Sequence, residues 1–409
     1  MTAIQQARRP AVGFIFVTMT LSVLGFGLLI PVLPDLVTQF QGGHVDAGSH
    51  AYGILVGVYA LLQFIGSPIL GALSDRLGRR KVILIALAGA SIDYLIMANA
   101  PNMTWLFIGR MISGFTAGVM ATANAYIADV TPPEKRAQSY GLLGAAFGIG
   151  FVFGPMVGGL LGSISLRLPF WFAAGCAGLN WMYGFFLLPE SLAPENRRAF
   201  DWKRANPIGA LKALKRFPAA RGLADAYFIL MLAQMMLFST WVLYMGYRFH
   251  WTTIEVGVSL GISGIMMGAV QAGLVKRIVA RFGDERTALA GFAISVASYI
   301  AYGLATKGWM IYAIIVLGSF GGIAGPAMQS FLSKQVPANE QGGVQGIFSG
   351  LSSLAGIPGP LIGAWSFGWA VAHRRSWHIP GIAFFEAAVF IALAMVLTAR
   401  TFRKAANAR

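Results

Sequence analysis

Apolar residues fall in long stretches along the chain, and short polar segments separate them. Each stretch has roughly 20 residues or more, which is the length that a helix needs to cross a hydrocarbon core of about 30 Å. The stretches do not alternate apolar and polar residues, as the strands of a membrane barrel would. The pattern predicts an all-α membrane protein with 12 transmembrane helices, at residues 11–38, 51–73, 82–99, 103–128, 138–161, 169–188, 223–244, 255–273, 287–305, 309–333, 343–369 and 380–399.

The two halves of the chain carry matching motifs at a fixed spacing. RLGRR in the first half corresponds to RFGDE in the second, and FGPMVGG corresponds to PGPLIGA. A spacing of 205 residues separates the matched glycines, which are Gly78 and Gly283, Gly154 and Gly359, and Gly141 and Gly346. Transporters are commonly built from two related halves with the substrate site between them. The repeat therefore predicts two pseudo-symmetric six-helix bundles.

The predicted domain organisation follows from this repeat. The N-terminal bundle is expected at residues 1–188 and the C-terminal bundle at 222–409. Residues 189–221 between them are polar and rich in basic residues and proline. We interpret them as a cytoplasmic linker that is partly an amphipathic helix at the bilayer surface.

The net charge of +16, from 31 Lys and Arg against 15 Asp and Glu, raises the question of nucleic-acid binding. With a cytoplasmic N-terminus, 25 of the 31 basic residues lie in cytoplasmic segments and five on the opposite side, which leaves only Arg110 in the membrane. This distribution follows the positive-inside rule and predicts that both termini are cytoplasmic. The basic character therefore reflects membrane topology, and we exclude nucleic acid as a partner. A hydrophobic content of 56% indicates that lipid surrounds the protein.

Charged residues inside membrane helices are costly unless they are paired or hydrated, so the few that occur are candidates for function. Asp93 in the third span and Arg110 in the fourth lie at matching depths, about 20 Å or slightly less from the cytoplasmic face at 1.5 Å per residue. Our hypothesis is that they pair and form a proton-linked switch in which Asp93 titrates. The alternative is a static ion pair that fixes helix register. Glu386 in the last span is a further candidate proton site.

The segment GALSDRLGRRK at residues 71–81 joins the second and third spans on the cytoplasmic side. Its glycines permit a tight turn, and its charges can pair with one another and with helix ends. An ordinary basic loop is the alternative interpretation. The charged residues of this loop and of the end of the fourth span that could form such pairs are Asp75, Arg76, Arg79, Arg80, Asp129 and Arg136.

Small residues mark one face of the fifth span, where glycine recurs every fourth position around Pro155. Such a face lets another helix approach closely. The helix-packing motif comprises Gly150, Gly154, Pro155, Gly158 and Gly159. Polar and aromatic residues in other spans are candidates to line a central substrate cavity, although hydrogen bonding or packing between helices explains them as well; they are Gln63, Asn124, Gln234 and Trp241.

The loop at 71–81 resembles that of the major facilitator superfamily, and the Gly–Pro motif of the fifth span resembles that of its drug/proton antiporter branch. Stretches such as GFGLLIPVLPDL, GVYALLQFIGSPILGALSDRLGRRKV and LSKQVPANEQGGVQG are similar to twelve-helix tetracycline efflux proteins. The resemblance implies that these charged residues form a cytoplasmic gate, with a charge latch that includes Asp75. It also implies that the second latch is weaker, because Ala280 stands at the position matching Asp75. It also implies exchange of a magnesium–tetracycline complex for protons, with Asp93, Arg110 and Gln63 at matching positions.

The sequence departs from these exporters where they carry acids in the first and ninth helices, because Ser22 and Ser295 stand there. An acid-containing stretch is likewise replaced at residues 244–247. The transporter class follows from the resemblance, but tetracycline as the substrate does not.

We therefore predict a secondary active transporter of the bacterial inner membrane, not an enzyme, that exports a lipophilic small molecule in exchange for protons by alternating access. Proton-coupled uptake or facilitated diffusion of a small metabolite is the alternative, and a membrane enzyme or receptor is a remote one. The five histidines lie in outer loops or at their edges, so no metal site is expected. The expected partners are the substrate, protons and lipid, with no obligate protein partner. No cofactor is predicted, and magnesium would enter only with a tetracycline-like substrate.

Overall fold

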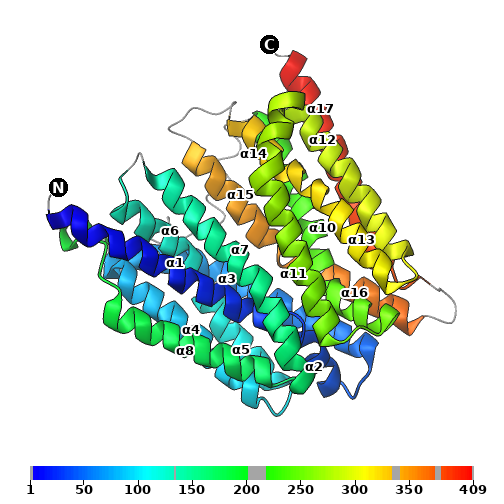
Figure 1. Ribbon diagram of the computed structural model, residues 1–409, viewed down its shortest axis with the longest axis horizontal. Coiled ribbons are helices and arrows are strands. Elements are labelled where there is room, and N and C mark those ends of the chain that lie inside the picture. Colours follow the sequence, from blue (N-terminus) through cyan, green and yellow to red (C-terminus); the bar gives the residue numbers. More distant parts are fainter. Residues whose placement is uncertain (1–2, 133–134, 201–217, 334–340, 374–378, 408–409) are drawn as a thin grey trace. The chain divides into compact units, whose positions relative to one another are not determined.

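A computed structural model describes residues 3–132, 135–200, 218–333, 341–373 and 379–407 of the 409-residue chain. Every regular element in these ranges is a helix, which confirms the predicted all-α class (Figure 1). The elements of the first half are α1 (Ala3–Leu29), α2 (Leu33–Phe40), α3 (Val45–Leu77), α4 (Arg79–Asn99), α5 (Met103–Thr116), α6 (Val119–Val130), α7 (Arg136–Ile164), α8 (Leu168–Leu187) and η2 (Pro194–Asn196). The amphipathic helix expected in the linker falls largely on residues 201–217, outside the described residues.

The second half continues with helices of similar length. They are α10 (Pro218–Phe249), α11 (Thr253–Ala269), η4 (Val270–Leu274), α12 (Val275–Leu304), α13 (Gly308–Gly318), η5 (Ser319–Ile323), α14 (Ala324–Ser333), α15 (Gln341–Ala355), α16 (Pro358–Ala372) and α17 (Ile382–Asn407). η4 is a single turn of π-helix, and η5 is a short 3-10 helix.

Ten helical stretches among the described residues are long and apolar enough to cross a membrane. One of them, Thr253–Leu304, has 52 residues and breaks sharply at Gly283, so it contains two of the predicted spans. α8 is not among the ten, because its tryptophans, Asn180 and glycines lower its hydropathy, yet its 20 residues can cross the membrane. Counting both parts of the long stretch and α8 gives the predicted 12.

The first predicted span, 11–38, is not one helix. α1 ends at Leu29, and α2 begins at Leu33 after a turn in which the Val32 amide donates to the Leu29 carbonyl over 3.2 Å. Pro31 and Pro34 explain the break, because a proline has no N–H to continue the helical ladder and its ring hinders the preceding turn.

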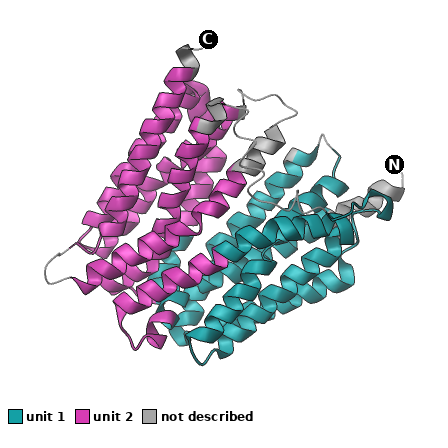
Figure 2. Ribbon diagram, turned by 180° about the vertical axis from the view of Figure 1, so that it is seen from behind, with its two compact units in different colours: residues 1–36, 61–207, 253–261 teal, residues 37–60, 208–252, 262–409 magenta. Residues whose placement is uncertain are grey.

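Contacts divide the chain into two compact units (Figure 2). Unit 1 comprises residues 1–36, 61–207 and 253–261, and unit 2 comprises residues 37–60, 208–252 and 262–409. Each unit draws most of its residues from one half of the chain, and two segments are exceptions. The first part of α3 belongs to unit 2, and the first part of α11 belongs to unit 1. The boundaries expected from the repeat, at 188 and 222, remain a prediction.

Each of these two segments packs closely in the unit to which it belongs. Within unit 2, the rings of His50 and Trp365 lie 5.2 Å apart between centroids, so α3 packs on α16. Within unit 1, the Thr253 hydroxyl donates to the Gly159 carbonyl over 2.9 Å, so the start of α11 packs on α7. A Cβ at Gly257 would collide with the Pro155 carbonyl, which shows how closely these backbones approach.

Each unit has its own apolar core, and apolar side chains also cover much of its outside. In unit 1, Ile15, Tyr126 and Ala146 are fully buried, whereas Phe186 is 73% exposed. In unit 2, Phe292, Ala327 and Ile391 are among the fully buried residues. Large apolar side chains exposed on this scale are expected where lipid replaces water as the surrounding medium.

The predicted duplication is visible in the backbone at one pair of repeat-related glycines. Gly78 has φ 101° and ψ 153°, and Gly283 has φ 78° and ψ 166°. This region of backbone space is essentially restricted to glycine. The same turn therefore begins the third span of each half, with a spacing of 205 residues.

Candidate functional site

Asp93 and Arg110 form an ion pair inside unit 1, between α4 and α5. Arg110 Nη2 pairs with Asp93 Oδ2, and Arg110 Nε donates to Oδ1 over 3.3 Å. Asp93 is 0% exposed and Arg110 is 4% exposed, so the pair is removed from solvent. The sequence predicted this contact from the depths of the two residues. Whether the pair carries protons stays a prediction.

The surroundings of the pair explain how two helices hold it. Gly109 precedes Arg110, and a Cβ there would lie 2.7 Å from Asp93 Oδ1, so only glycine leaves room for the carboxylate. The Arg110 guanidinium also lies 6.0 Å from the centroid of the Tyr94 ring, close enough for a cation–π contribution. Two N–H donors on one carboxylate give a directional contact that resists rotation of either helix.

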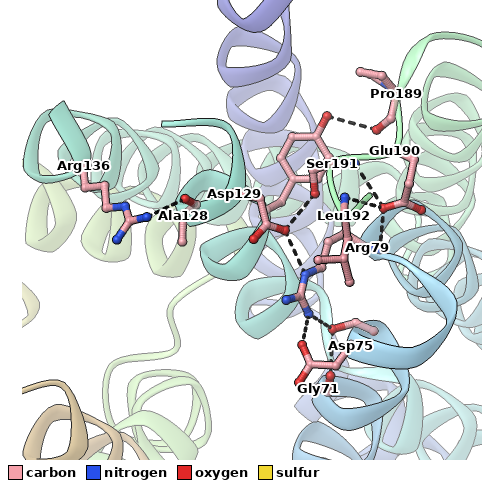
Figure 3. Close-up of polar contacts among 12 residues, drawn as sticks. Gly71, Asp75, Arg79, Ala128, Asp129, Arg136, Pro189, Glu190, Ser191 and Leu192 are labelled. Carbon is pink, nitrogen blue, oxygen red and sulfur yellow. Dashed lines mark hydrogen bonds and ion pairs between the residues drawn. The ribbon is translucent and has the colours of Figure 1, made fainter. Parts of the chain in front are cut away.

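A second cluster of charges lies at the end of α3, the start of α4 and the end of α6, and Figure 3 shows it. Arg79 is 8% exposed, and its guanidinium contacts two carboxylates. Nη1 lies 2.6 Å from Asp75 Oδ1, and Nε lies 3.1 Å from Asp129 Oδ2. Nη1 also donates to the Ser74 hydroxyl over 2.6 Å. Asp75, Arg79 and Asp129, all predicted gate residues, thus meet in one network that joins α3, α4 and α6.

Glu190, which the sequence interpretation assigned to the linker, belongs to this network. Its Oε1 accepts from the backbone amides of Arg79 at 2.8 Å, Ser191 at 3.1 Å and Leu192 at 3.2 Å (Figure 3). A Cβ at Gly78 would collide with its other oxygen. A carboxylate at the start of a helix accepts hydrogen bonds from backbone amides that have no partner within the helix. Its negative charge also interacts favourably with the positive end of the helix dipole. Glu190 therefore ties the segment after α8 to the first turn of α4.

Ser191 and Tyr126 strengthen the same junction. The Ser191 hydroxyl donates to Asp129 Oδ2 over 3.0 Å, and the Tyr126 hydroxyl donates to the Pro189 carbonyl over 3.1 Å (Figure 3). The sequence signal for this junction was an acid and a hydroxyl, Glu190 and Ser191, just after the sixth span.

The other predicted gate residues have different partners. Arg136 donates to the carbonyls of Ala128 at 2.9 Å and Thr131 at 3.3 Å, so it covers the end of α6. Arg80 Nη2 donates to the Phe185 carbonyl, with the guanidinium 5.9 Å from the Phe185 ring. Arg76 is exposed. Arg79 is thus the arginine of this loop that bridges the two acids.

The glycines of α7 lie against neighbouring backbones in unit 1. A Cβ at Gly154 would lie 2.8 Å from Gly27 Cα, and one at Gly150 would lie 2.7 Å from Val23 Cβ. A Cβ at Gly158 would collide with the Leu28 carbonyl. These three positions face α1, while Gly159 and Pro155 contact α11 as described above.

The predicted cavity residues differ in exposure. Asn124 is exposed, and Gln63 and Gln234 are half-buried. Trp241 is 4% exposed, because its ring packs at right angles on Tyr302 with centroids 5.1 Å apart. Glu386 is half-buried, and its Oε2 is buried without a hydrogen-bond partner among the described residues.

A polar cluster that the sequence interpretation missed links α8 to α1. Asn180 is fully buried, and its Nδ2 donates to the Thr18 carbonyl at 3.0 Å and to the Ser22 hydroxyl at 3.3 Å. The Ser22 hydroxyl donates to the Thr18 carbonyl over 2.8 Å. Ser22, where we expected a departure from the similar exporters, is therefore part of a helix-to-helix contact. Asn180 within an apolar span was the only signal for it.

No three His, Cys, Asp or Glu side chains gather to hold a metal ion in the part of the chain that the structure describes. The fold is a bundle of membrane-length helices, and its buried charges form pairs and clusters between helices. These features define a multi-pass membrane protein.

The chain belongs to the Major Facilitator Superfamily, whose profile it matches over residues 15–360 and 223–408. It is 42% identical to the tetracycline resistance protein of class C from Escherichia coli over 345 residues, which are 84% of this chain and 86% of that protein. It is 37% identical to the class G tetracycline resistance protein of Vibrio anguillarum, over 85% of this chain and 90% of that one. A bacterial homologue of the human lysosomal transporter Spinster has the same fold, with a TM-score of 0.77 at 16% identity, over 99% and 98% of the two chains.

Proposed function

We propose that the protein exports a lipophilic small molecule, tetracycline-like or otherwise amphipathic, in exchange for protons by alternating access. The names of the relatives support drug export, and the buried ion pair of Asp93 and Arg110 supports proton coupling. In this proposal the protein resides in a bacterial inner membrane with both termini in the cytoplasm. The proton gradient supplies the energy, and magnesium enters only as part of a substrate complex.

The Asp93–Arg110 pair is the observation that carries this proposal. An arginine keeps its charge, so only Asp93 can change protonation. A protonated Asp93 would deprive the buried Arg110 charge of the counter-ion that Asp93 supplies, and breaking a buried pair in this way costs about 3–5 kcal/mol. The state with the pair closed is therefore favoured when Asp93 is ionised. A protonated Asp93 favours a state in which Arg110 finds another partner or water, and this difference can link proton binding to a conformational change.

The cluster around Arg79 provides a candidate gate for the same cycle. Asp75 and Asp129 hold one guanidinium between α3 and α6, so movement of α6 relative to α3 must break at least one of these contacts. We propose that the cluster stabilises one state of the cycle and opens in another. Its residues lie at the cytoplasmic ends of the predicted spans, at the side where an exporter loads its substrate.

The decisive experiment is substrate transport by the Asp93→Asn variant in proteoliposomes. Wild-type protein should accumulate tetracycline in vesicles with an acidic interior. In the variant, accumulation driven by the pH gradient should fall at least tenfold, while exchange of labelled for unlabelled tetracycline persists. Asp225→Asn is the matched control, because Asp225 is an exposed acid on α10. Unchanged pH-driven accumulation would rule out the coupling role, and loss of exchange as well would favour a purely structural ion pair.

The substrate class has a separate test in cells that lack their own exporters. Expression should raise tolerance to tetracyclines or to other amphipathic drugs and dyes. Protection against another compound with no effect on tetracycline would replace the tetracycline-like substrate and leave export intact. Substrate entry that follows a gradient into the cell would instead favour uptake or facilitated diffusion.

A further inference from the structure

Two neighbouring helices of unit 1 each lack part of the regular backbone hydrogen-bond ladder. The span predicted at 103–128 is broken between α5 and α6, where the Gly118 amide donates to the Thr116 carbonyl over 2.7 Å instead of continuing the ladder. The neighbouring α3 is a continuous helix, but Pro68 inside it has no N–H to donate to the ladder. Ser67 on α3 donates its hydroxyl to the carbonyl of Ala117 at the break, over 3.3 Å. A proline-containing segment thus lies directly against a broken helix.

In unit 2, two neighbouring helices are also irregular, one through a π-helical turn and the other through a 3-10 turn. The π-helical turn η4 interrupts the helix between α11 and α12, and the 3-10 turn η5 interrupts the helix between α13 and α14. The two irregular turns contact each other. Short π and 3-10 segments inside longer helices often mark hinges or functional positions.

These four features lie in pairs at matching positions of the internal repeat. The spacing of 205 residues that relates Gly78 to Gly283 also relates Pro68 on α3 to Gly273 in η4. It relates Gly118 at the α5–α6 break to Ile323, the last residue of η5. In each half, the second and fourth spans therefore depart from the regular α-helical ladder at the same repeat positions. In the first half the departures are the missing N–H of Pro68 and the break at Gly118, and in the second half they are a π turn and a 3-10 turn.

A neighbouring helix packs closely against each irregular position. A Cβ at Gly66 on α3 would collide with the Phe115 carbonyl, and one at Gly321 in η5 would collide with the Ser295 hydroxyl on α12. An interrupted ladder has fewer i to i−4 hydrogen bonds, so bending there disrupts less than bending in a regular helix. Close backbone packing at these positions restricts where a bend can form. The freed carbonyl of Ala117 keeps a partner in Ser67, as a low-dielectric environment requires.

We propose that these paired interruptions are repeat-related hinges, one in each unit, at which the second and fourth spans of each half bend during the transport cycle. The inference rests on alternating access in the proposed function for its role in transport. The local flexibility that it requires does not depend on any substrate.

The experiment compares two glycine-to-alanine variants three residues apart. Gly322 lies in η5 and Gly325 in α14, and a Cβ added at either position meets nothing within 4 Å. Alanine favours regular helix over glycine by a factor of about five in population. Gly322→Ala should therefore slow amide hydrogen exchange of residues 319–324 about fivefold in detergent or nanodiscs and should slow tetracycline turnover without weakening tetracycline binding. Gly325→Ala, in a regular helix, should leave turnover unchanged.

A variant in unit 1 should change the rate of amide hydrogen exchange in the opposite direction. Ser67→Ala removes the hydroxyl that holds the Ala117 carbonyl, so exchange at residues 117–122 should become faster. Ser163→Ala is its control, because the Ser163 hydroxyl bonds a carbonyl of its own helix, α7. The hinge proposal is overturned if both irregular segments exchange as slowly as the adjoining helices, or if Gly322→Ala and Gly325→Ala behave alike. A wild-type protein that exchanges as expected but moves no tetracycline would contradict the proposed substrate and leave the hinges standing.

Discussion

A comparison of substitutions at Gly78 and Gly283 measures how much Glu190 contributes to the free energy of unfolding. Both glycines have nearly the same backbone conformation, in a region that costs about 1–3 kcal/mol for any other residue. A Cβ at Gly283 meets nothing within 4 Å, whereas one at Gly78 would collide with the Glu190 carboxylate. Replacing each glycine by alanine should therefore destabilise both variants by the same backbone strain, and Gly78→Ala by an additional amount.

The additional amount follows from what Glu190 does. Its Oε1 accepts three backbone amides, and displacing it removes the cap of α4. Loss of a helix cap typically costs about 1 kcal/mol, and the exposure of the Glu190 side chain argues against a larger value. We expect the free energy of unfolding of Gly78→Ala to be lower than that of Gly283→Ala by about 1 kcal/mol.

The assay is denaturant unfolding in detergent micelles, followed by the fluorescence of the ten tryptophans. In a Glu190→Ala background, Gly78→Ala and Gly283→Ala should cost the same, which gives a coupling energy of about 1 kcal/mol between positions 78 and 190. Equal costs in the wild-type background would refute the reasoning. So would a penalty for Gly78→Ala that persists undiminished when Glu190 is absent.

Two further predictions concern α7 and the cluster around Arg79. Gly154→Ala should destabilise the protein by about 1–3 kcal/mol, because its Cβ would lie 2.8 Å from the Gly27 backbone, whereas Gly148→Ala, which meets nothing within 4 Å, should not; denaturant unfolding measures both. Asp129→Asn should weaken the contact to Arg79 and change the rate of substrate transport while substrate binding stays the same, and an unaltered rate would contradict a gating role for this contact.

Several features of the fold were predictable because they depend only on which residue types stand at which positions along the chain. The spans and the duplication come from hydropathy and from the spacing of glycines. The contact between Asp93 and Arg110 was predictable because depth in a membrane helix is proportional to residue number. A charge buried at a given depth can be paired only by another charge at about the same depth.

Other features could not be predicted because they depend on local backbone geometry or on contacts distant in the sequence. The break at Gly118 lies in a span whose hydropathy is continuous, so the pattern gave no sign of it. Glu190 was assigned to the linker because polarity alone does not show that a carboxylate caps a helix more than a hundred residues away. The loop at 71–81 has several arginines, and only the three-dimensional arrangement shows that Arg79 bridges Asp75 and Asp129.

The attachment of the segment after α8 has a consequence for how this chain can be divided. Glu190 binds the start of α4, and the Arg198 amide donates to the Asp75 carbonyl over 3.0 Å. The eleven residues that follow α8, 188–198, are therefore attached to unit 1 at two points. A protein engineer who expresses the halves as separate chains, or inserts a tag between them, should cut after residue 198, because a cut at residue 188 would remove both fastenings from the fragment that needs them.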